Sequence, residues 1–462
     1  MNAFKITIHH LSIQIMKNNS SFTRRKFVKT TSAAAIGTPL ILKSSMLKGA
    51  GISAASDKIN LGIIGCGGLG KANLFAVAEH PDVVVTAACD VWKERLDPIV
   101  EKYKKTCTGY SDYRDLLQHK GLDAVIIATP AHWHATQAVE AAHAGLDIYL
   151  QKPMTMHLGE SLAVRNAVKK HNVICQIGTQ IHASEHYRRM VELVRSGNLG
   201  DIGTIRTFFT MNEAPKGIGL GNNSMNIPKG LDWDMWVGPA PMQDYNPNLV
   251  KDAFYHCFWN DFSGGWTPGM APHITDLPIW ALDLDYPTEI SAAGGRYIIK
   301  DDSDAYDNHE VIWRYPNLTM TWMMSCTNSY GFDFLRGQES RRRLGIYFHG
   351  VNGTLYTDYN NHEVLPEGKR MDGMQAPPKS LPPSPGHELE WVECIKSRKQ
   401  PSCNPGYHVK VDIPIQLSVL SMKLGRSIKF DPKTETIVGD DKAAGLAIPE
   451  YRGPWKFPKE YL

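Results

Sequence analysis

The chain contains the stretch Asn60-Leu-Gly-Ile-Ile-Gly-Cys-Gly-Gly-Leu-Gly70, in which an apolar run leads directly into spaced glycines. Gly65, Gly67 and Gly70 have the spacing G-x-G-x-x-G, and a helical pattern follows them. After a strand, these glycines allow a tight turn, a close approach of the backbone to a pyrophosphate, and packing of helix against strand. The pyrophosphate would lie on amide groups at the helix N-terminus. The stretch therefore predicts the start of a dinucleotide-binding domain.

An acidic residue follows at the distance that a dinucleotide site requires. Asp90 lies twenty residues after Gly70, at the end of a second strand-like run from Val83 to Cys89. A carboxylate at this place accepts hydrogen bonds from an adenosine ribose and repels a 2′-phosphate. We therefore expect NAD as the cofactor, in preference to NADP. The glycines alone also fit a purely structural turn, and Asp90 argues against that alternative.

Strand-like and helical runs alternate from Lys58 to about Gly178. The strand-like runs are Ile59–Ile64, Val83–Cys89, Ala124–Ala128, Asp147–Leu150 and Val173–Ile177. The helical runs between them include Lys93–Lys104, His132–Ala144 and Gly159–His171. Short apolar strands joined by helices predict an α/β domain with a Rossmann-like, doubly wound parallel sheet. Ligands bind at the carboxyl ends of such strands, where Asp90, Pro130 and Lys152 fall.

The pattern changes after this domain, which we place at residues 58–181. A helix near Ser184–Arg195 precedes longer strands at Gly203–Met211, Glu289–Ile299, His309–Tyr315, Leu318–Ser325, Ile346–Phe348 and Thr354–Thr357. Further helices are expected at His387–Ser397 and about Ile413–Gly425. Residues 182–462 are therefore predicted to form a second α+β domain with a large, mostly antiparallel open sheet. This domain would bind substrate and join copies into a homodimer or homotetramer.

An irregular stretch between Asn212 and Gly265 is rich in Gly, Asn, Pro and Trp. Long loops without regular structure are usually functional in compact domains. The stretch and its flank supply aromatic side chains at Trp233, Trp236, Tyr255, Trp259 and Trp266. These rings are suited to stacking on a sugar, and they are equally suited to pinning the loop through their own cluster.

The N-terminus has the pattern of a twin-arginine export signal. Thr23-Arg-Arg-Lys-Phe-Val-Lys29 precedes an apolar stretch from about Thr30 to Leu42, which is too short to span a bilayer as a mature helix. An amphipathic or anchoring tail is the alternative. We assign residues 1–57 to signal and linker and expect a folded periplasmic protein without a stable membrane span. Because NAD is scarce outside the cytoplasm, the cofactor would travel inside the protein.

Composition limits the possible partners. The chain has 462 residues and a formal charge of +3, which gives no sign of a polyanion partner. The cluster Arg341–Arg343 is better explained as a solvated loop than as a nucleic-acid patch. The eight cysteines include no CxxC pair and do not form the pattern of a disulfide framework. We expect them to be buried apolar side chains.

Together with the glycines and Asp90, Thr129-Pro-Ala-His-Trp-His134 and Gln151-Lys-Pro153 resemble motifs of the glucose–fructose oxidoreductase/inositol dehydrogenase family, Gfo/Idh/MocA. Gly265-Trp-Thr-Pro-Gly-Met-Ala-Pro-His-Ile-Thr-Asp276 resembles the catalytic helix of that family. The resemblance covers nearly the whole chain after the signal, and the C-terminal region is similar to exported bacterial members. There are two departures. The common Glu-Lys-Pro reads Gln-Lys-Pro, and the frequent Asp four residues before the helix histidine is Gly269.

The resemblance implies that Lys152 lies beside the nicotinamide and a substrate hydroxyl. Oxidation of a secondary alcohol requires removal of a proton as hydride leaves the same carbon. A lysine near a positively charged nicotinamide has a lowered pKa and can exchange that proton near neutral pH. The alternative is a surface lysine after a strand, which its place at a strand end disfavours.

The remaining site residues follow from the same resemblance. His273 would assist proton transfer or bind the hydroxyl, and Asp276, one helical turn later, would orient it. His132 and His134 would line the nicotinamide pocket or only cap a helix. His182 and His186 have the i, i+4 spacing of a metal pair, but no carboxylate partner is identifiable, so no metal site is expected.

The expected sites are as follows. The cofactor would contact Gly65, Gly67, Gly68, Leu69, Gly70, Asp90, Thr129, Pro130, His132, His134, Gln151, Lys152 and Gln180. The substrate would contact Tyr187, Trp236, Trp259, Trp266 and His273. The catalytic group would be Lys152, His273 and Asp276.

These residues predict a NAD-dependent oxidoreductase acting on a hydroxyl carbon of a carbohydrate or polyol. A NAD-dependent glycosidase or lyase, which oxidises a sugar transiently and eliminates the aglycone, is the second possibility. A non-catalytic sugar-binding protein is the third.

Overall fold

The computed structural model describes residues 58–220, 226–251, 254–332 and 343–462. The expected export signal, as well as Arg341 and Arg342, lies outside these ranges. Within them, no helix combines the length and the apolar character needed to cross a membrane.

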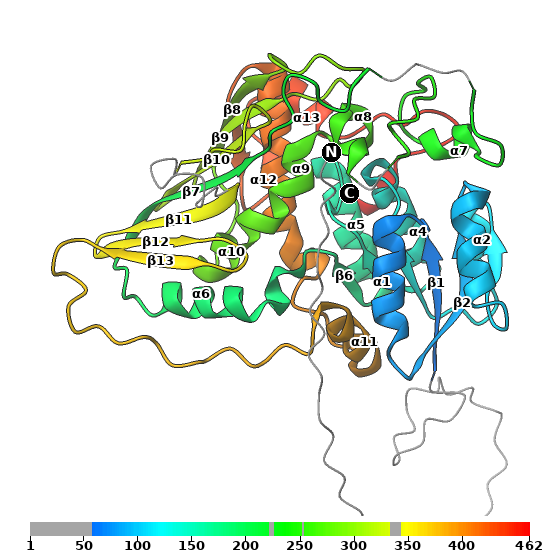
Figure 1. Ribbon diagram of the computed structural model, residues 1–462, viewed down its shortest axis with the longest axis horizontal. Helices are drawn as coiled ribbons and strands as arrows, with labels where there is room; N and C mark the ends of the chain where they lie inside the picture. The colour runs from blue at the N-terminus through cyan, green and yellow to red at the C-terminus, as the bar shows by residue number, and fades with distance from the viewer. Residues whose placement is uncertain (1–57, 221–225, 252–253, 333–342) are drawn as a thin grey trace, which may run out of the picture. The chain divides into compact units, whose positions relative to one another are not determined.

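The first sheet has six parallel strands in the order β3-β2-β1-β4-β5-β6. Its strands are β1 Ile59–Ile64, β2 Val83–Cys89, β3 Thr108–Tyr110, β4 Ala124–Ile127, β5 Asp147–Leu150 and β6 Cys175–Ile177. The helices that connect them are α1 Gly68–Ala78, α2 Lys93–Lys102, α3 Tyr113–Leu117, α4 His134–His143 and α5 Leu158–His171 (Figure 1). The strand order reverses between β1 and β4, and ligands bind at this point of a doubly wound sheet.

The second sheet has nine strands in the order β13-β12-β11-β7-β10-β9-β8-β14-β15. They are β7 Ile202–Thr210, β8 Glu289–Gly295, β9 Asn308–Arg314, β10 Thr319–Ser325, β11 Leu344–Gly350, β12 Gly353–Thr357, β13 His362–Pro366, β14 Ile428–Asp431 and β15 Thr436–Ile437. All neighbouring pairs are antiparallel except β7 with β10. The two sheets confirm the predicted fold class.

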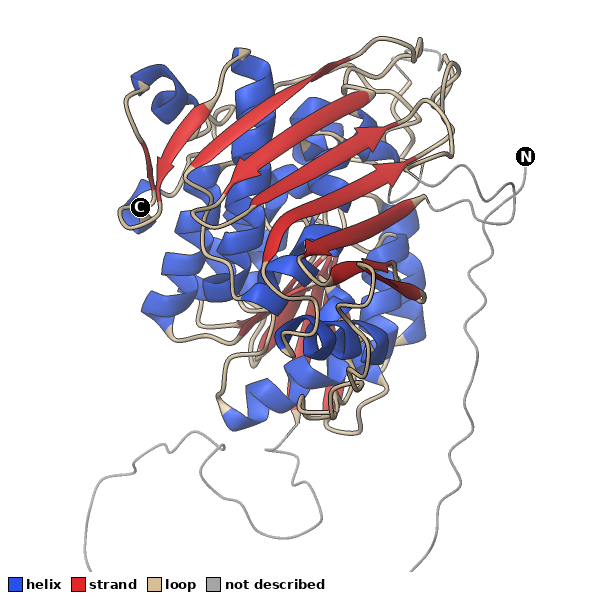
Figure 2. Ribbon diagram, turned by 90° about the vertical axis from the view of Figure 1, so that its left-hand side faces the viewer, coloured by secondary structure: helices blue, strands red, loops and turns tan. Residues whose placement is uncertain are grey.

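Among the described residues, helices cover only one face of the second sheet, and the other face has none packed on it (Figure 2). On β9, Val311 and Trp313 are buried, whereas Ile312 is exposed. Side chains of a strand alternate between faces, so this pattern reflects one packed and one open face. Helices α10 Pro272–Leu282 and α12 Pro405–Leu424 pack on the covered face.

The other helices of the second part are short or lie at its edges. They are α6 Glu185–Arg195, α7 Trp233–Val237, α8 Asn260–Ser263, α9 Trp266–Met270, α11 His387–Ser397 and α13 Asp441–Leu446. Single 3₁₀ turns occur at η3 Ala131–Trp133, η4 Gln180–Ala183, η5 Tyr255–Phe258 and η7 Lys459–Tyr461. Helix α12 begins eight residues before the predicted start, at Pro405 instead of Ile413. The Asn404 side chain accepts a hydrogen bond from the Tyr407 amide there, and proline suits a first helical turn.

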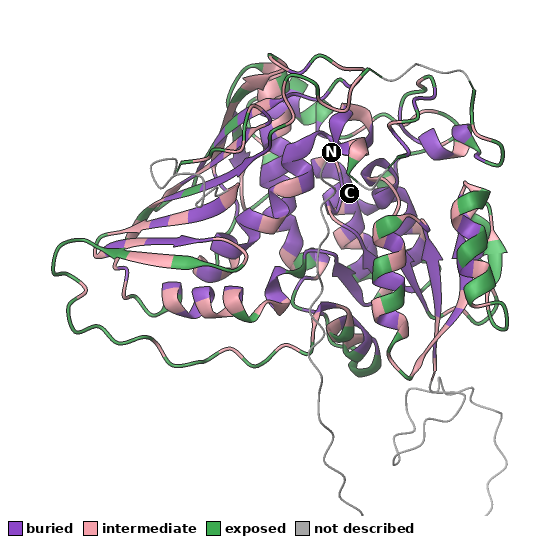
Figure 3. Cartoon of the chain, viewed as in Figure 1, coloured by how far each residue is buried: buried purple, intermediate pink, exposed green. Residues whose placement is uncertain are grey.

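Helix α11 packs on the first sheet although its residues lie in the range assigned to the second domain. The Trp391 side chain is fully buried in the same hydrophobic cluster as Leu61 and Tyr149. Its ring lies edge-on to Tyr149, with centroids 5.6 Å apart. The central strands of this sheet are buried (Figure 3), and Trp391 of α11 belongs to the hydrophobic cluster on one of its faces. The chain therefore returns to its first domain after building most of the second.

Candidate active site

A cavity of about 370 Å³ opens at the carboxyl ends of β1, β2, β4 and β5. Its volume lies within the range of small-molecule and cofactor sites, about 300–1,000 Å³. The predicted site residues that line it are Gly65, Gly67, Gly68, Leu69, Asp90, Thr129, Pro130, His134, Gln151, Lys152 and Trp236. The irregular stretch before α8 supplies a further wall, so residues far apart in the sequence share one cavity.

The glycine turn is too tight for a side chain at two of its positions and open at a third. Gly65 has φ +94°, and a Cβ there would lie 2.6 Å from the Ala128 carbonyl oxygen. A Cβ at Gly70 would lie 2.0 Å from the Gly65 carbonyl oxygen, so neither position admits a side chain. A Cβ at Gly68 meets nothing within 4 Å. Helix α1 begins there without a side-chain cap, which leaves amide groups for a pyrophosphate, so the turn fits NAD.

Asp90 is held rigidly at the end of β2. Its carboxylate accepts hydrogen bonds from the amides of Cys66 at 2.7 Å and Trp92 at 2.9 Å. Burial raises the pKa of the Asp90 carboxyl, and the two backbone donors oppose this effect. Each oxygen uses one acceptor site for the backbone, so the other sites remain for ribose hydroxyls. Arg95 lines the same part of the cavity, with its guanidinium 4.9 Å from the Trp92 ring centroid.

Lys152 follows β5 and points into the cavity. Its Nζ donates a hydrogen bond of 2.9 Å to the backbone carbonyl oxygen of Gly269. Removal of the amine from water lowers the pKa of Lys152. Within the described ranges, no carboxylate forms an ion pair with this amine to oppose the shift. The amine therefore loses its proton more easily than that of an exposed lysine.

Gln151 stands where the family commonly has Glu, and its side chain forms hydrogen bonds with neutral groups. Its side-chain amide donates to Asn73 Oδ1 at 2.7 Å, and Asn73 in turn donates to the Tyr149 hydroxyl at 3.2 Å. Gln151 Oε1 accepts a hydrogen bond of 3.1 Å from the Lys152 amide. The amide thus fixes the backbone that carries Lys152 without placing a negative charge beside it.

The second departure from the family pattern, Gly269, is explained by its neighbour Cys257. A Cβ at Gly269 would lie 3.0 Å from Cys257 Sγ, which is closer than most such contacts allow. The thiol therefore fills the space in which a family aspartate would begin. Burial raises the pKa of Cys257 to about 11, so the thiol is neutral at physiological pH.

His273 lies near Lys152 without lining the cavity. Burial lowers the pKa of His273 well below its ordinary value, and the nearby Lys152 charge lowers it further. Its ring is edge-on to Tyr359, with centroids 6.5 Å apart. Asp276 directs its carboxylate to His182 at 3.1 Å and to the Tyr407 hydroxyl. Among the described residues, Asp276 makes no hydrogen bond to His273, so it does not orient that ring as expected.

The two histidines of η3 and α4 have structural partners. His134 lies with its ring nitrogens 2.6 Å from the Pro153 carbonyl and 2.8 Å from the Thr129 carbonyl, and so links two strand-end loops. His132 lies 3.0 Å from the Trp236 carbonyl and lines a second cavity on the other side of η3. Neither side chain caps α4.

Several expected contact residues are placed away from the cavity. Tyr187, Trp259 and Trp266 are buried, and Gln180 is exposed; none of the four lines the cavity. Trp236 is stacked on Trp233 with centroids 4.7 Å apart, so the aromatic cluster pins its own loop and presents one ring to the cavity.

Sequence reasoning missed His256, which lines the cavity and comes from the irregular stretch. Burial lowers the pKa of His256 to about 3, with a further contribution from the Lys152 charge, so its imidazole is neutral. Phe254 also lines the cavity, with its ring centroid 5.9 Å from Lys152 Nζ. The sequence shows only that this histidine lies in a loop rich in aromatic residues, and no motif with a defined spacing identifies it as a site residue.

Family models match both parts of the chain. The NAD-binding Rossmann fold of the Gfo/Idh/MocA oxidoreductase family matches residues 59–179, and the C-terminal alpha/beta domain of that family matches residues 209–457. Residues 59–179 are thus a NAD-binding domain, and the glycine turn and Asp90 fit the cofactor.

Individual relatives match mainly in part of the chain. YrbE, an uncharacterized oxidoreductase of Bacillus subtilis, is 32% identical over 145 residues, which cover 31% of this chain and 42% of YrbE. The scyllo-inositol 2-dehydrogenase (NAD(+)) of Bacillus subtilis is 30% identical over 151 residues, covering 31% and 42% of the two chains. A glycosyl hydrolase family 109 protein of Shewanella baltica is 27% identical over 159 residues, covering 33% and 35%. The chain thus spans less than half the length of these relatives.

One solved structure shows the same fold over most of the chain. The WlbA dehydrogenase from Chromobacterium violaceum, solved in complex with NADH and UDP-GlcNAcA, superposes with a TM-score of 0.59 at 16% identity. The similarity covers 81% of this chain and 96% of WlbA.

Proposed function

The chain belongs to the Gfo/Idh/MocA oxidoreductase family, and from this premise we propose that it oxidises a hydroxyl-bearing carbon of a carbohydrate or polyol. The observation that carries the proposal is Lys152, an amine with a lowered pKa in the cavity that also contains the glycine turn. When bound, NAD supplies the hydride acceptor of such a reaction. The activities of the sugar and polyol dehydrogenases among the relatives support this reaction class.

Lys152 is the base in this proposal. In its neutral form the amine takes the proton of the substrate hydroxyl, and in the reverse direction the ammonium returns it. The Gly269 carbonyl at 2.9 Å orients the amine while it carries the proton. The carbonyl is neutral, so it positions Lys152 without the pKa increase that a carboxylate would cause.

The rest of the cavity is suited to a sugar ring. Trp236 and Phe254 provide apolar surfaces, and aromatic rings stack on the apolar face of a pyranose or cyclitol. His256 remains neutral, so it can exchange a hydrogen bond with a substrate hydroxyl but cannot act as a cationic acid near pH 7. His273 lies outside the lining and is kept neutral by burial, so any assistance would come from its position near Lys152 and not from a charge on its ring.

The twin-arginine pattern at Arg24 and Arg25 supports export of the folded protein to the periplasm with its cofactor bound. A cofactor that cannot exchange outside the cytoplasm must be regenerated while it stays bound. A second, carbonyl-containing substrate would reoxidise it.

The open face of the nine-stranded sheet supports assembly into a homodimer or homotetramer.

The proposal is tested with protein purified from the periplasm. Mass spectrometry of the released ligand is expected to find NAD, and a panel of sugars and polyols is expected to reduce it, as followed by NADH fluorescence. Failure of every sugar and polyol to reduce bound or added NAD would contradict the oxidoreductase activity. It would favour a sugar-binding protein that keeps a vestigial NAD fold.

A NAD-dependent glycosidase or lyase is the second proposal, and Gly269 is the observation that favours it. A missing family aspartate is compatible with divergent chemistry, and one relative bears a glycosyl hydrolase name. This reaction would release free sugar and aglycone from a glycoside without net change in NADH. Dehydrogenation alone would give equal amounts of NADH and oxidised sugar.

A further inference from the structure

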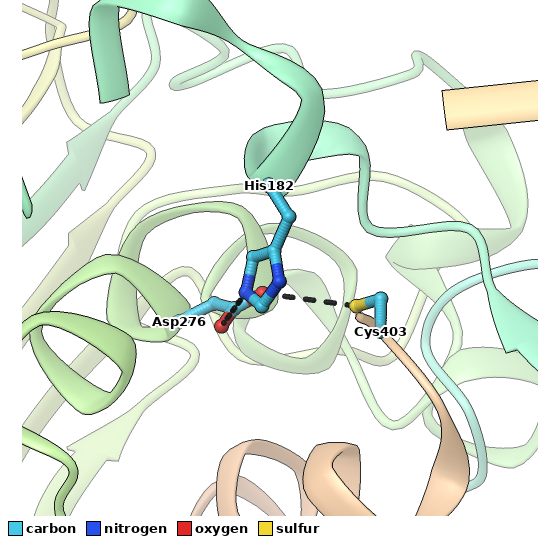
Figure 4. A group of neighbouring side chains, drawn as sticks. All are labelled: His182, Asp276 and Cys403. Carbon is cyan, nitrogen blue, oxygen red and sulfur yellow. Dashed lines mark hydrogen bonds and ion pairs between the residues drawn. The ribbon is translucent and has the colours of Figure 1, made fainter. Parts of the chain in front are cut away.

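A cluster of metal-binding side chains lies apart from the cofactor cavity. His182 of η4, Asp276 of α10 and Cys403, which lies just before α12, turn toward one another (Figure 4). Their ligand atoms all lie within 4.8 Å of one another, and the three residues are 2%, 0% and 0% exposed. None of them lines the cofactor cavity. The site chemistry proposed above therefore leaves this cluster unexplained.

The separations in the cluster approach those of a tetrahedral zinc site. His182 Nε2 lies 3.1 Å from Asp276 Oδ1, and Cys403 Sγ lies 4.0 Å from Asp276 Oδ2. Ligands of tetrahedral Zn²⁺ at bond lengths of about 2.0–2.3 Å are separated by about 3.3–3.6 Å. These atoms are close enough together for movements of the side chains to bring them around one metal ion. Imidazole, thiolate and carboxylate are all common ligands of zinc.

His408 of α12 lies beside the cluster, outside the group of ligand atoms that all lie within 4.8 Å of one another. Its Nδ1 lies 3.8 Å from Cys403 Sγ. Its other nitrogen, Nε2, lies 3.5 Å from Thr179 Oγ1, an arrangement typical of a metal-binding histidine whose second nitrogen is held by an outer partner. The Tyr407 hydroxyl donates to Asp276 Oδ1 and supports the carboxylate in the same way.

Charge provides an independent argument. Asp276 is fully buried, and no lysine or arginine among the described residues forms an ion pair with it; its one such partner is His182. A buried carboxylate requires a compensating positive charge. A divalent cation with the Asp276 carboxylate, the Cys403 thiolate and two neutral imidazoles is electrically neutral.

We propose that His182, Asp276 and Cys403 form a structural zinc site that joins η4, α10 and the start of α12, with His408 as the fourth ligand once its ring moves toward the other three. The complete burial of the first three ligands leaves no open position for water, which is the mark of a structural rather than a catalytic site. His186, the i, i+4 neighbour of His182, is not part of it, because its Nε2 lies 3.0 Å from Thr357 Oγ1. The site differs from the expectation of no metal, since its ligands come from distant parts of the chain.

Metal analysis of the full chain tests the site without reference to activity. We expect one zinc per chain after incubation with zinc and removal of loose metal, and cobalt substitution is expected to give the thiolate charge-transfer band and intense visible bands of tetrahedral Co²⁺. Cys403→Ser is expected to lose the charge-transfer band and to lower zinc affinity at least tenfold. The matched control Cys326→Ser changes another buried cysteine and is expected to keep both signals.

Two results would overturn the proposal. Folded, unsubstituted protein that retains less than a tenth of an equivalent of zinc after loading has no such site. If Cys403→Ser and Asp276→Asn both bind zinc with unchanged affinity, the metal binds at another site. Both results are independent of whether the chain oxidises a sugar.

Discussion

The amine of Lys152 lies 2.9 Å from the backbone carbonyl of Gly269, at the position where the family frequently carries an aspartate. The carbonyl dipole orients the amine, and Cys257 Sγ fills the space that a side chain at this position would require. The site thus pairs its lysine with a neutral acceptor. The pKa of Lys152 is consequently lowered by burial without an opposing carboxylate beside it.

Gly269→Asp is expected to impair oxidation at neutral pH rather than restore a family feature. The new Cβ would press against Cys257 Sγ at 3.0 Å, and the carboxylate would raise the pKa of Lys152. The pH at which kcat reaches half its maximum should move upward by about one unit or more. Gly269→Ala, which adds the crowding without the charge, should leave that pH unchanged. If the pH profile of kcat does not shift in Gly269→Asp, Lys152 is not the group whose titration controls kcat.

His256→Phe is expected to raise KM for the sugar by about 10- to 100-fold and to leave the Kd of NAD within about twofold. The substitution removes one hydrogen bond to a buried hydroxyl, a loss of about 1–3 kcal/mol. Steady-state kinetics and NADH titration measure the two quantities. His186→Phe changes a histidine bonded to Thr357 outside the cavity and should alter neither. A raised Kd for NAD in His256→Phe would place this residue in the cofactor site instead.

Asp90→Ser is expected to relax the preference for NAD. The substitution removes the acceptor of the ribose hydroxyls and the charge that repels a 2′-phosphate, and Arg95 in the same part of the cavity could then pair with that phosphate. The ratio of kcat/KM for NAD to that for NADP should fall by about 10- to 100-fold. Asp97→Ser, on the exposed side of α2, is the control. An unchanged ratio in Asp90→Ser would contradict the assigned role.

Stability is expected to fall as pH decreases from about 6.5 to about 4.5. Burial lowers the pKa of His132 and His309 to about 4 and that of His387 to about 3, while the unfolded chain protonates histidine near pH 6.5. The unfolded state therefore binds more protons in this window, and each histidine destabilises the fold by roughly 1 kcal/mol per pH unit. Burial raises the pKa of Asp412 to about 6, so this carboxyl binds a proton in the folded state and offsets the destabilisation caused by about one histidine.

His387→Phe isolates one of these contributions. Both ring nitrogens of His387 are buried without a hydrogen-bond partner among the described residues, and its ring packs edge-on to Tyr149 at 5.7 Å. The variant should lose less stability between pH 7 and pH 5 in urea unfolding than the unsubstituted protein. His362→Phe, on an exposed position of β13, should lose as much as the unsubstituted protein. Equal losses in both variants would contradict a neutral buried His387.

Local patterns predicted the NAD-binding domain well because its strands are apolar and buried on both faces. The predicted bounds of β1, β2 and β5 coincide with those observed. Long-range packing was not predictable in this way. Nothing in the sequence around Trp391 shows that α11 returns to the first sheet, since that contact depends on a cluster with Leu61 and Tyr149.

The site was predictable where a motif fixes its spacing and unpredictable where a loop supplies the residues. The glycine turn, Asp90 and Lys152 line the cavity because strand ends converge there. Cys257 and His256 come from an irregular stretch whose path no pattern specifies. The partner of Asp276 was also unpredictable, since His182 precedes it by 94 residues and meets it only through tertiary packing.

Single-turnover kinetics of Lys152→Met tests the central claim most directly, with the sugar that the screen identifies. The Kd of NAD should remain within about threefold, and the rate of hydride transfer should fall by about 10²- to 10⁴-fold, the contribution of a positioned base. Lys251→Met removes another lysine that lines the cavity and should keep at least about one third of the rate, because it changes no catalytic group. A rate for Lys152→Met equal to that of Lys251→Met would contradict the account.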